Sequence, residues 1–405
     1  MTKPPPAMKV PLLDLTPQYE KIAAEVQAAI ARVCRSQQFI LGAEVRELEL
    51  RLARYSGCAH GIGVSSGTDA LLLALMALGI GPGDEVITSP FTFFATAGTI
   101  ARLGARPLFC DIDGQDFNLS PARVDELIAR ECEVRGDGGN RHVIHRKTGG
   151  RVKAIMPVHL YGQVCDMDAL MGIASRLGLY VIEDAAQAIG AQDGGGRMAG
   201  GIGHIGCFSF FPTKNLGAFG DAGLCTTSDS ALAERMRVLR VHGAEPKYHH
   251  SLIGGNFRLD EIQAAVLNVK LGSLDDWMAA RDRHARQYSE ALSAAGAVVT
   301  PVRSRGGRHV WNQYVIRAQR RDELRQHLAA AGVGTEIYYP IPLHLQQCFA
   351  YLAYRPGQLP EAERAAREVL ALPVFPELSP AQIDHVTGTI QRFYSAAESP
   401  SQQSA

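Results

Sequence analysis

The sequence lacks an excess of charge of either sign, and this absence excludes several classes of protein. Lysine plus arginine and aspartate plus glutamate each number 41 in the 405 residues. A nucleic-acid-binding protein is expected to show a basic excess, and a solvating or disordered protein an acidic tail. The balance therefore predicts no nucleic-acid partner.

Long apolar runs and paired cysteines are also missing. The longest apolar run, residues 70–80, is shorter than the roughly 20 residues that cross a bilayer. Residues 1–10 carry Lys3 without an apolar segment behind it, so they do not match a signal peptide. The eight cysteines form no C-x-x-C pair, and the adjacent His249 and His250 would point apart, so no metal site is expected. We therefore expect a cytoplasmic protein with reduced thiols and no membrane partner.

What the sequence does contain is a regular alternation of strand and helix patterns. This alternation predicts an α/β fold, with a mostly parallel sheet flanked by helices. Residues 131–151, rich in glycine, arginine and histidine, show neither period and are expected to form a surface excursion. The expected strands are 61–64, 85–88, 106–111, 152–157, 179–182 and 223–227, and the expected helices are 17–35, 43–55, 70–78, 95–103, 167–177, 230–241 and 257–271.

The length predicts more than one domain, because a single hydrophobic core usually stops growing below this size. We expect a large domain over residues 1–272, including the N-terminal helices, and a smaller α+β domain over 273–395. Residues 396–405 are expected to be a disordered tail. In the smaller domain the expected strands are 297–301, 314–317 and 335–338, and the expected helices are 274–294, 322–331 and 361–370.

A single lysine, Lys214, stands between an aromatic run and a glycine-rich loop in the stretch 207–223. Burial lowers the pKa of a lysine because it disfavours the charged form, and a neutral amine can form a Schiff base. The alternative interpretation is a surface lysine beside a turn. Local pattern alone does not separate the two.

Two further places could bind an anion or orient a ligand. A Ser/Gly/Thr turn at residues 66–69 joins a strand to a helix, and its free backbone N–H groups could bind a phosphate. The alternative interpretation is an ordinary N-cap by Ser66 or Thr68. Asp184 and His159 follow strands, at the edge where ligands bind in open α/β sheets. Asp184 is also compatible with a helix N-cap.

Read together, these motifs resemble the DegT/DnrJ/EryC1/StrS family of pyridoxal-phosphate-dependent sugar aminotransferases, which implies the fold-type I aminotransferase architecture. The resemblance extends from about residue 10 to 393 and leaves out 131–151 and the tail. The matching segments are SSGTDAL (65–71), EVITSPFTFFAT (85–96), PVHLYG (157–162), VIEDAAQAIGA (181–191), FSFFPTKNLGAFGDAG (208–223), NFRLDEIQAA (256–265) and TEIYYPIPLHLQ (335–346).

The resemblance implies roles around the ring of the cofactor, pyridoxal 5'-phosphate. Lys214 matches the lysine that forms the Schiff base and moves the proton. Asp184 matches the carboxylate that keeps the pyridine nitrogen protonated, so that the ring accepts electrons. Gln187 matches the partner of the ring hydroxyl, and Phe93 the aromatic side chain that stacks on the ring.

The resemblance also implies a phosphate site and a dimer. Gly67, Thr68 and Ser209 match the phosphate cup. Asn256 matches a residue that reaches the phosphate from the second subunit, which implies a homodimer with shared active sites. The family's sugar-nucleotide site corresponds to His159, Tyr161, Arg258, Tyr338 and His344. For Arg258 the alternative is an ion pair with Asp260 or Glu261 at a helix start.

The implied reaction is transamination of a nucleotide-linked keto sugar with L-glutamate, at C3 rather than C4, in amino-sugar biosynthesis for a surface polysaccharide or a glycosylated metabolite. Retention of Lys214 favours transamination over dehydration, because dehydratases of the family carry histidine there. A cyclitol or aminoglycoside transaminase is a further alternative within the enzymes. A non-catalytic regulatory protein is a third hypothesis, which the presence of Lys214, Asp184 and Gln187 disfavours.

Overall fold

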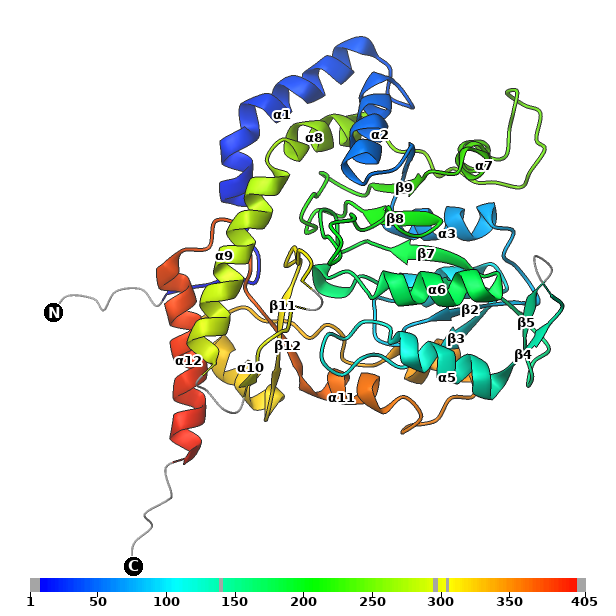
Figure 1. Cartoon of the computed structure of the whole chain (residues 1–405). Helices are drawn as coiled ribbons and strands as arrows, with labels where there is room; N and C mark the ends of the chain where they lie inside the picture. The colour runs from blue at the N-terminus through cyan, green and yellow to red at the C-terminus, as the bar shows by residue number, and fades with distance from the viewer. Residues whose placement is uncertain (1–7, 138–140, 294–297, 304–305, 399–405) are drawn as a thin grey trace, which may run out of the picture.

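The computed structural model describes residues 8–137, 141–293, 298–303 and 306–398 (Figure 1). In these residues a nine-stranded sheet has the order β1-β9-β8-β7-β6-β2-β3, and β5, which pairs with β4, joins it beside β6. The run β3-β2-β6-β7-β8 is parallel, whereas β9 is antiparallel to both of its neighbours. The predicted mostly parallel sheet is thus confirmed. The strands are β1 (His60–Val64), β2 (Asp84–Thr88), β3 (Arg106–Phe109), β4 (Cys132–Arg135), β5 (His142–His145), β6 (Arg151–Met156), β7 (Tyr180–Asp184), β8 (Ile205–Ser209) and β9 (Gly223–Thr227).

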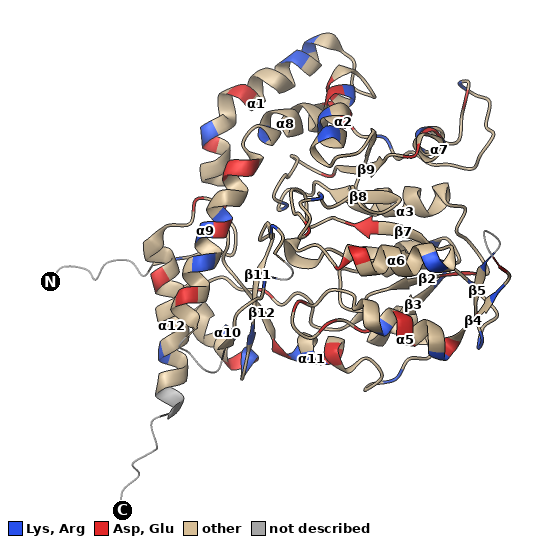
Figure 2. Cartoon of the chain, viewed as in Figure 1, with Lys and Arg blue, Asp and Glu red and all other residues tan. Residues whose placement is uncertain are grey.

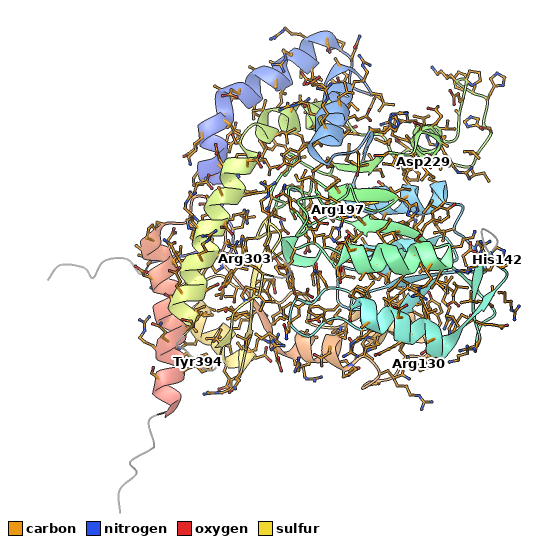
Figure 3. The ribbon with its side chains drawn as sticks, viewed as in Figure 1. Arg130, His142, Arg197, Asp229, Arg303 and Tyr394 are labelled. Carbon is orange, nitrogen blue, oxygen red and sulfur yellow. The ribbon has the colours of Figure 1, made fainter. Side chains whose placement is uncertain are left out.

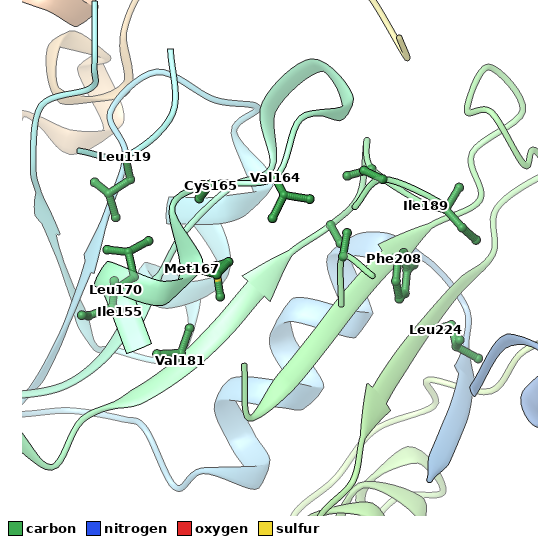
Figure 4. Packing of buried hydrophobic residues seen from close by; sticks show 14 of the residues in the cluster. Leu119, Ile155, Val164, Cys165, Met167, Leu170, Val181, Ile189, Phe208 and Leu224 are labelled. Carbon is green, nitrogen blue, oxygen red and sulfur yellow. The ribbon is translucent and has the colours of Figure 1, made fainter. Parts of the chain in front are cut away.

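Helices cover both faces of this sheet, because its central strands bury side chains on both sides. In β8, Phe208 packs into a cluster with residues of α6, whereas Ile205 and Cys207 pack on the opposite face with residues of α3 and α7. Figure 4 shows the first of these clusters, with Val181 of β7 facing α6. The helices of this part are α1 (Thr16–Ser36), α2 (Ala43–Tyr55), α3 (Gly67–Ala77), α4 (Ala95–Arg102), α5 (Pro121–Glu131), α6 (Met167–Leu177), α7 (Ser230–Arg240) and α8 (Glu261–Leu271).

The C-terminal part is smaller and is built on a three-stranded antiparallel sheet, β10-β11-β12. Its core contains Tyr288, Trp311 and Tyr314, and Val10 from the N-terminal segment also packs there. The Val10 N–H donates to the Gly332 carbonyl at 2.9 Å. The elements are α9 (Leu274–Leu292), β10 (Val298–Val299), β11 (Tyr314–Ala318), α10 (Arg321–Ala330), α11 (Pro360–Glu368), β12 (Val369–Leu372) and α12 (Pro380–Glu398).

The structure corrects several element predictions. The excursion over 131–151 contains the hairpin β4–β5, whose second strand pairs with β6; its alternating apolar residues are too few to show a period. Residues 257–260 are extended, and α8 begins at Glu261. The predicted helix 361–370 ends at Glu368 and continues as β12, because β11 offers a pairing edge. Of the expected strand 335–338 only an isolated bridge from Glu336 to Ala371 forms.

Two helices are absent from the sequence prediction, α5 and α12. Helix α12 runs to Glu398, into the stretch expected to be a disordered tail, and residues 399–405 lie outside the described structure.

Charges of both signs are interspersed on the outer helices α1 and α9 (Figure 2). Asp229, at the start of α7 in Figure 3, caps that helix by accepting from the N–H groups of Ala231 and Leu232. Within the described residues, no helix combines the length and apolarity that crossing a membrane requires.

Candidate active site

Lys214 lies in a compact loop that follows β8. The loop folds back on the strand, since the Ala218 N–H donates to the Phe210 carbonyl at 2.8 Å. A Cβ on Gly217 would come within 2.3 Å of the Pro212 carbonyl oxygen, so only glycine allows this turn. The Lys214 side chain is half-buried. Burial lowers the pKa of Lys214 to about 8, although the negative charge of Asp184 opposes the shift.

Asp184 ends β7 with a carboxylate that is only 4% exposed. Its Oδ2 accepts a hydrogen bond from Thr96 Oγ1 at 2.7 Å, and its Oδ1 accepts from the Ala186 N–H at 3.2 Å. Burial raises the pKa of Asp184, against the effect of these donors and of the nearby Lys214. The residues after it form turns rather than a helix, so the N-cap alternative for Asp184 is wrong.

The N-terminus of α3 lies against the end of β8. Ser66 is the N-cap, since its Oγ accepts from the Asp69 N–H at 3.0 Å, so the ordinary cap exists. The N–H groups of Gly67 and Thr68 stand in the first turn, where no intrahelical acceptor is available. A Cβ on Gly67 would come within 2.5 Å of the Ser209 Cβ. The structure thus brings Gly67, Thr68 and Ser209 together around a helix end that suits an anion.

Gln187 and several aromatic side chains lie beside these groups. The Gln187 Oε1 accepts from the Tyr161 N–H at 2.7 Å, and its Nε2 donates to the Tyr339 hydroxyl at 3.1 Å. Because a primary amide has two N–H donors, one remains for a ligand. The Tyr161 hydroxyl donates to the Tyr338 carbonyl, which joins two more of the predicted residues. Phe93 is 58% exposed, with its ring centroid 6.3 Å from that of Tyr339.

Two predicted substrate residues do not line an open site in this structure. His159 is completely buried; its Nε2 donates to Glu183 at 2.8 Å and its Nδ1 accepts from the Cys165 N–H at 3.2 Å. Both ring nitrogens are therefore used within the protein. His344 is also buried, with Nε2 3.2 Å from Glu363 Oε1. In this structure both imidazoles are enclosed by protein, and their contact with a sugar stays a prediction.

The side chain of Arg258 has no polar partner among the described residues. Its backbone pairs with Val64 at the end of β1, just before α3. The expected alternative, an ion pair with Glu261, is not formed, since that carboxylate accepts the N–H groups of Gly42 and Glu44 instead. Among the described residues, Arg258 makes no side-chain hydrogen bond or ion pair, and its Nε is buried without an acceptor. Asn256, two residues earlier, is exposed.

Sequence reasoning missed two residues of this site. Thr96, fully buried in α4, supplies the side-chain hydroxyl that hydrogen-bonds Asp184, and Tyr339 contacts both Gln187 and Phe93. Both lie inside segments that carry the resemblance, 85–96 and 335–346. Their local patterns carry no signal, since the partner of each is distant in the sequence.

The residues present fit one kind of cofactor. An amine with a lowered pKa, a buried carboxylate and a glycine-lined helix end meet at the carboxyl edge of a parallel sheet. A pyridoxal-phosphate-dependent enzyme requires these groups, because they serve the aldehyde, the ring nitrogen and the phosphate. The fold and the site define that class.

The particular family follows from comparison with known proteins. The chain belongs to the DegT/DnrJ/EryC1/StrS aminotransferase family, whose model matches residues 20–391. It is 51% identical over 389 residues, 96% of this chain and 99% of the relative, to "Pleiotropic regulatory protein" of Geobacillus stearothermophilus. It is 42% identical to "dTDP-3-amino-3,4,6-trideoxy-alpha-D-glucose transaminase" of Streptomyces venezuelae, over 95% of this chain and 96% of the relative.

The cofactor is indicated by a solved structure that is similar to this chain. NtdA from Bacillus subtilis, with bound cofactor PMP, matches with a TM-score of 0.83 and 30% identity over 97% of this chain and 87% of that chain. The protein is an aminotransferase, and its cofactor is pyridoxal phosphate. This cofactor acts as an electron sink when bound.

Proposed function

We propose that this enzyme transfers an amino group from L-glutamate to the C3 ketone of a hexose linked to UDP or dTDP. The observation that carries the proposal is the placement of Lys214 beside the buried Asp184. The name of the S. venezuelae relative specifies a 3-amino sugar, which supports C3. All eight cysteines are free, which suits action in a reducing cytoplasm.

Each residue of the site has a proposed task. Lys214 holds the cofactor and then moves a proton, which a neutral amine can accept. Asp184 stays ionised against the ring nitrogen, with Thr96 orienting its carboxylate. Gln187 offers its remaining N–H to the ring hydroxyl, and Phe93 covers the ring face. The phosphate is bound by Gly67, Thr68 and Ser209 at the start of α3.

On the substrate side of the site we place three of the five predicted residues. The Arg258 side chain, which has no polar partner among the residues that the structure describes, offers a planar fork to a carboxylate or a phosphate. Tyr161 and Tyr338 shape the wall near Gln187. Because His159 and His344 are both buried, we propose that they stabilise the protein structure behind Tyr161 and Tyr338 and do not contact the sugar.

The name of the G. stearothermophilus relative favours a second candidate, a regulatory role. Against it, a purely regulatory protein would have no use for an amine with a lowered pKa beside a buried carboxylate. Purified protein separates the two hypotheses. An aminotransferase binds pyridoxal phosphate, shows its yellow colour, and loses that colour when glutamate is added.

The decisive experiment offers nucleotide keto-sugars with glutamate and identifies the product by mass and NMR. We expect amination of UDP- or dTDP-linked 3-keto sugars. Amination at C4, or activity only on sugars without a nucleotide, would contradict the substrate assignment. Arg258→Lys refines it: weaker use of a keto-uronate with unchanged use of a neutral hexose would place the guanidinium on the sugar carboxylate.

The Lys214→Ala variant tests the reaction itself. We expect no glutamate-dependent transamination and an intact fold, because the amine of Lys214 makes no hydrogen bond among the described residues. Activity at a tenth of the wild-type level or above would show that another lysine does this work. The matched control is Lys153→Ala, at a lysine that pairs with Asp84 at 2.9 Å.

A further inference from the structure

A second lysine, which is buried, holds the loop that carries Lys214. Lys270, in the last turn of α8, is 4% exposed, and its Nζ donates to the Gly217 carbonyl at 2.5 Å. Its ammonium lies 5.7 Å from the ring centroid of Phe219 and 5.9 Å from that of Trp277. Among the described residues, no carboxylate forms an ion pair with it.

Such a lysine is costly for the fold. Taking an ammonium out of water disfavours its charged form, and burial lowers the pKa of Lys270 to about 8. The compensation consists of one carbonyl and two aromatic faces. An apolar side chain of the same length would fill the space without that cost. An apolar residue could still pack on the two rings, but it could not supply the hydrogen bond to the Lys214 loop.

The same face of α8 makes a second attachment to this loop. Gln263 lies two turns before Lys270, and residues seven apart share a helix face. Its Oε1 accepts from the Phe219 N–H at 2.8 Å, and its Nε2 donates to the Phe219 carbonyl at 3.2 Å. Helix α8 therefore fixes the backbone at two places within five residues after Lys214.

The other side of the loop is held by the C-terminal part. The Asn215 Nδ2 donates to the Val310 carbonyl at 2.7 Å, and its Oδ1 accepts from Asn312 Nδ2 at 3.0 Å. The segment that carries these groups follows Arg303, which is labelled in Figure 3. Arg303 pairs with Asp282 of α9. The loop is thus anchored from α8 on one side and from residues 310–312 on the other.

We propose that Lys270 and Gln263 are positioning residues for transamination, which clamp the loop so that the Lys214 amine stays aligned for proton transfer. This inference rests on the proposed function for its catalytic consequence. The clamp itself is a property of the free protein, so the two can fail separately. A displacement of the amine by about 1 Å from its reacting position is enough to lower the rate of turnover by about 100-fold.

The test compares Lys270→Met and Gln263→Leu with a matched control, Lys153→Met. Lys153 also donates to a backbone carbonyl, that of Gly79 at 2.9 Å, but it lies far from the loop in the sequence, and within the described residues its polar contacts are with Gly79 and Asp84. The first readout is hydrogen exchange of the Lys214 and Ala218 amides in cofactor-free protein. Neither variant removes the acceptors of these two amides, which are the Phe211 and Phe210 carbonyls.

We expect both amides to exchange at least tenfold faster in Lys270→Met and Gln263→Leu, and at the wild-type rate in Lys153→Met. With cofactor and keto sugar, kcat should fall at least tenfold in the two clamp variants, while KM for the sugar stays within threefold. Unchanged exchange together with kcat within twofold of wild type would overturn the proposal. Global unfolding of both variants would also overturn it, since it would assign the residues to the fold.

Failure of the proposed function gives a different pattern. If the wild-type protein aminates no keto sugar, the transamination assignment fails. The exchange experiment still decides whether α8 clamps the loop, because it uses neither cofactor nor substrate.

Discussion

At the scale of single residues, the pKa values of Lys214 and Asp184 are shifted in opposite directions by the same cause, burial. Burial lowers the pKa of the amine and raises that of the carboxyl, so each is pushed toward its neutral form. The opposite charge of the partner counters both shifts. A cationic ring nitrogen beside Asp184 would add to this opposition and keep the carboxylate ionised.

The Asp184→Asn variant tests that role, since it keeps the shape and removes the charge. We expect the half-reaction with glutamate to slow by about 100-fold or more, roughly 2.7 kcal/mol of barrier, with a smaller effect on cofactor retention. Stopped-flow absorbance measures the rate. A rate within threefold of wild type would remove Asp184 from the mechanism, and Asp229→Asn, at the distant α7 cap, should stay at the wild-type rate.

The titration of Lys214 has a consequence for stability in cofactor-free protein. Its folded pKa, about 8, lies below the usual 10.5, so below pH 8 the folded state carries a half-buried charge at its full free-energy cost. This cost declines as pH rises through 8 toward 10.5, where the unfolded lysine also loses its proton.

We therefore expect Lys214→Met to be stabilised relative to wild type at pH 7 and to lose most of that advantage by pH 10. Cysteines and tyrosines also titrate in this pH range, but they are common to both proteins. Their contribution to the free energy of unfolding therefore cancels in the difference between variant and wild type. Urea unfolding at several pH values gives the difference. A difference that does not change with pH would show that Lys214 titrates normally.

At the scale of elements, α8 forms hydrogen bonds to two other segments of the chain. Besides the Lys214 loop, it holds the start of α2 through Glu261, which is 3% exposed. The Glu261 carboxylate accepts the N–H groups of Gly42 at 2.7 Å, Glu44 at 2.6 Å and Val45 at 3.3 Å. A carboxylate at a helix N-terminus satisfies donors that the helix cannot. Here the cap is supplied by another helix.

Glu261→Gln should destabilise the fold by about 1–3 kcal/mol, because the amide loses the charge and one of its two acceptor oxygens. Urea unfolding would measure the change. Glu290→Gln, at an exposed position of α9, serves as the control and should lie within about 0.5 kcal/mol of wild type. Equal stability of the two variants would contradict the capping role of Glu261.

At the scale of the whole molecule, we propose a homodimer in which Asn256 reaches the phosphate site of the partner. Asn256 is exposed, and the nearby Arg258 has a buried Nε without an acceptor in the described part of the chain, which supports this arrangement. If sites are shared, Lys214 and Asn256 of one site come from different chains. A dimer of one Lys214→Ala chain and one Asn256→Ala chain then contains one site with both residues intact.

Co-expression of these two variants under different affinity tags tests the proposal. We expect each variant alone to be nearly inactive, and the doubly tagged dimer to recover up to about half of the wild-type activity. A chain carrying both substitutions, paired with Lys214→Ala, should recover none because no site retains Lys214. Absence of recovery in the first pair would show that each chain completes its own site.

The sequence by itself determined the alternation of elements and the family. Helix 43–55 and helix 167–177 were predicted with the bounds they have, since their apolar spacing and end signals are local. The segment around Lys214 and the end of the strand at Asp184 were recognised for the same reason. The family assignment rests on many such segments in a fixed order, and it is confirmed by the match over residues 20–391.

Only the tertiary structure decided what depends on groups far apart in the chain. Glu261 meets the start of α2 across 217 residues, Thr96 meets Asp184 across 88, and Lys270 meets Gly217 across 53. Burial of His159 and His344 belongs here too, because a histidine has the same local pattern whether it faces a sugar or a carboxylate in the core. Hydrogen bonding and desolvation act through space, so a linear pattern does not contain them.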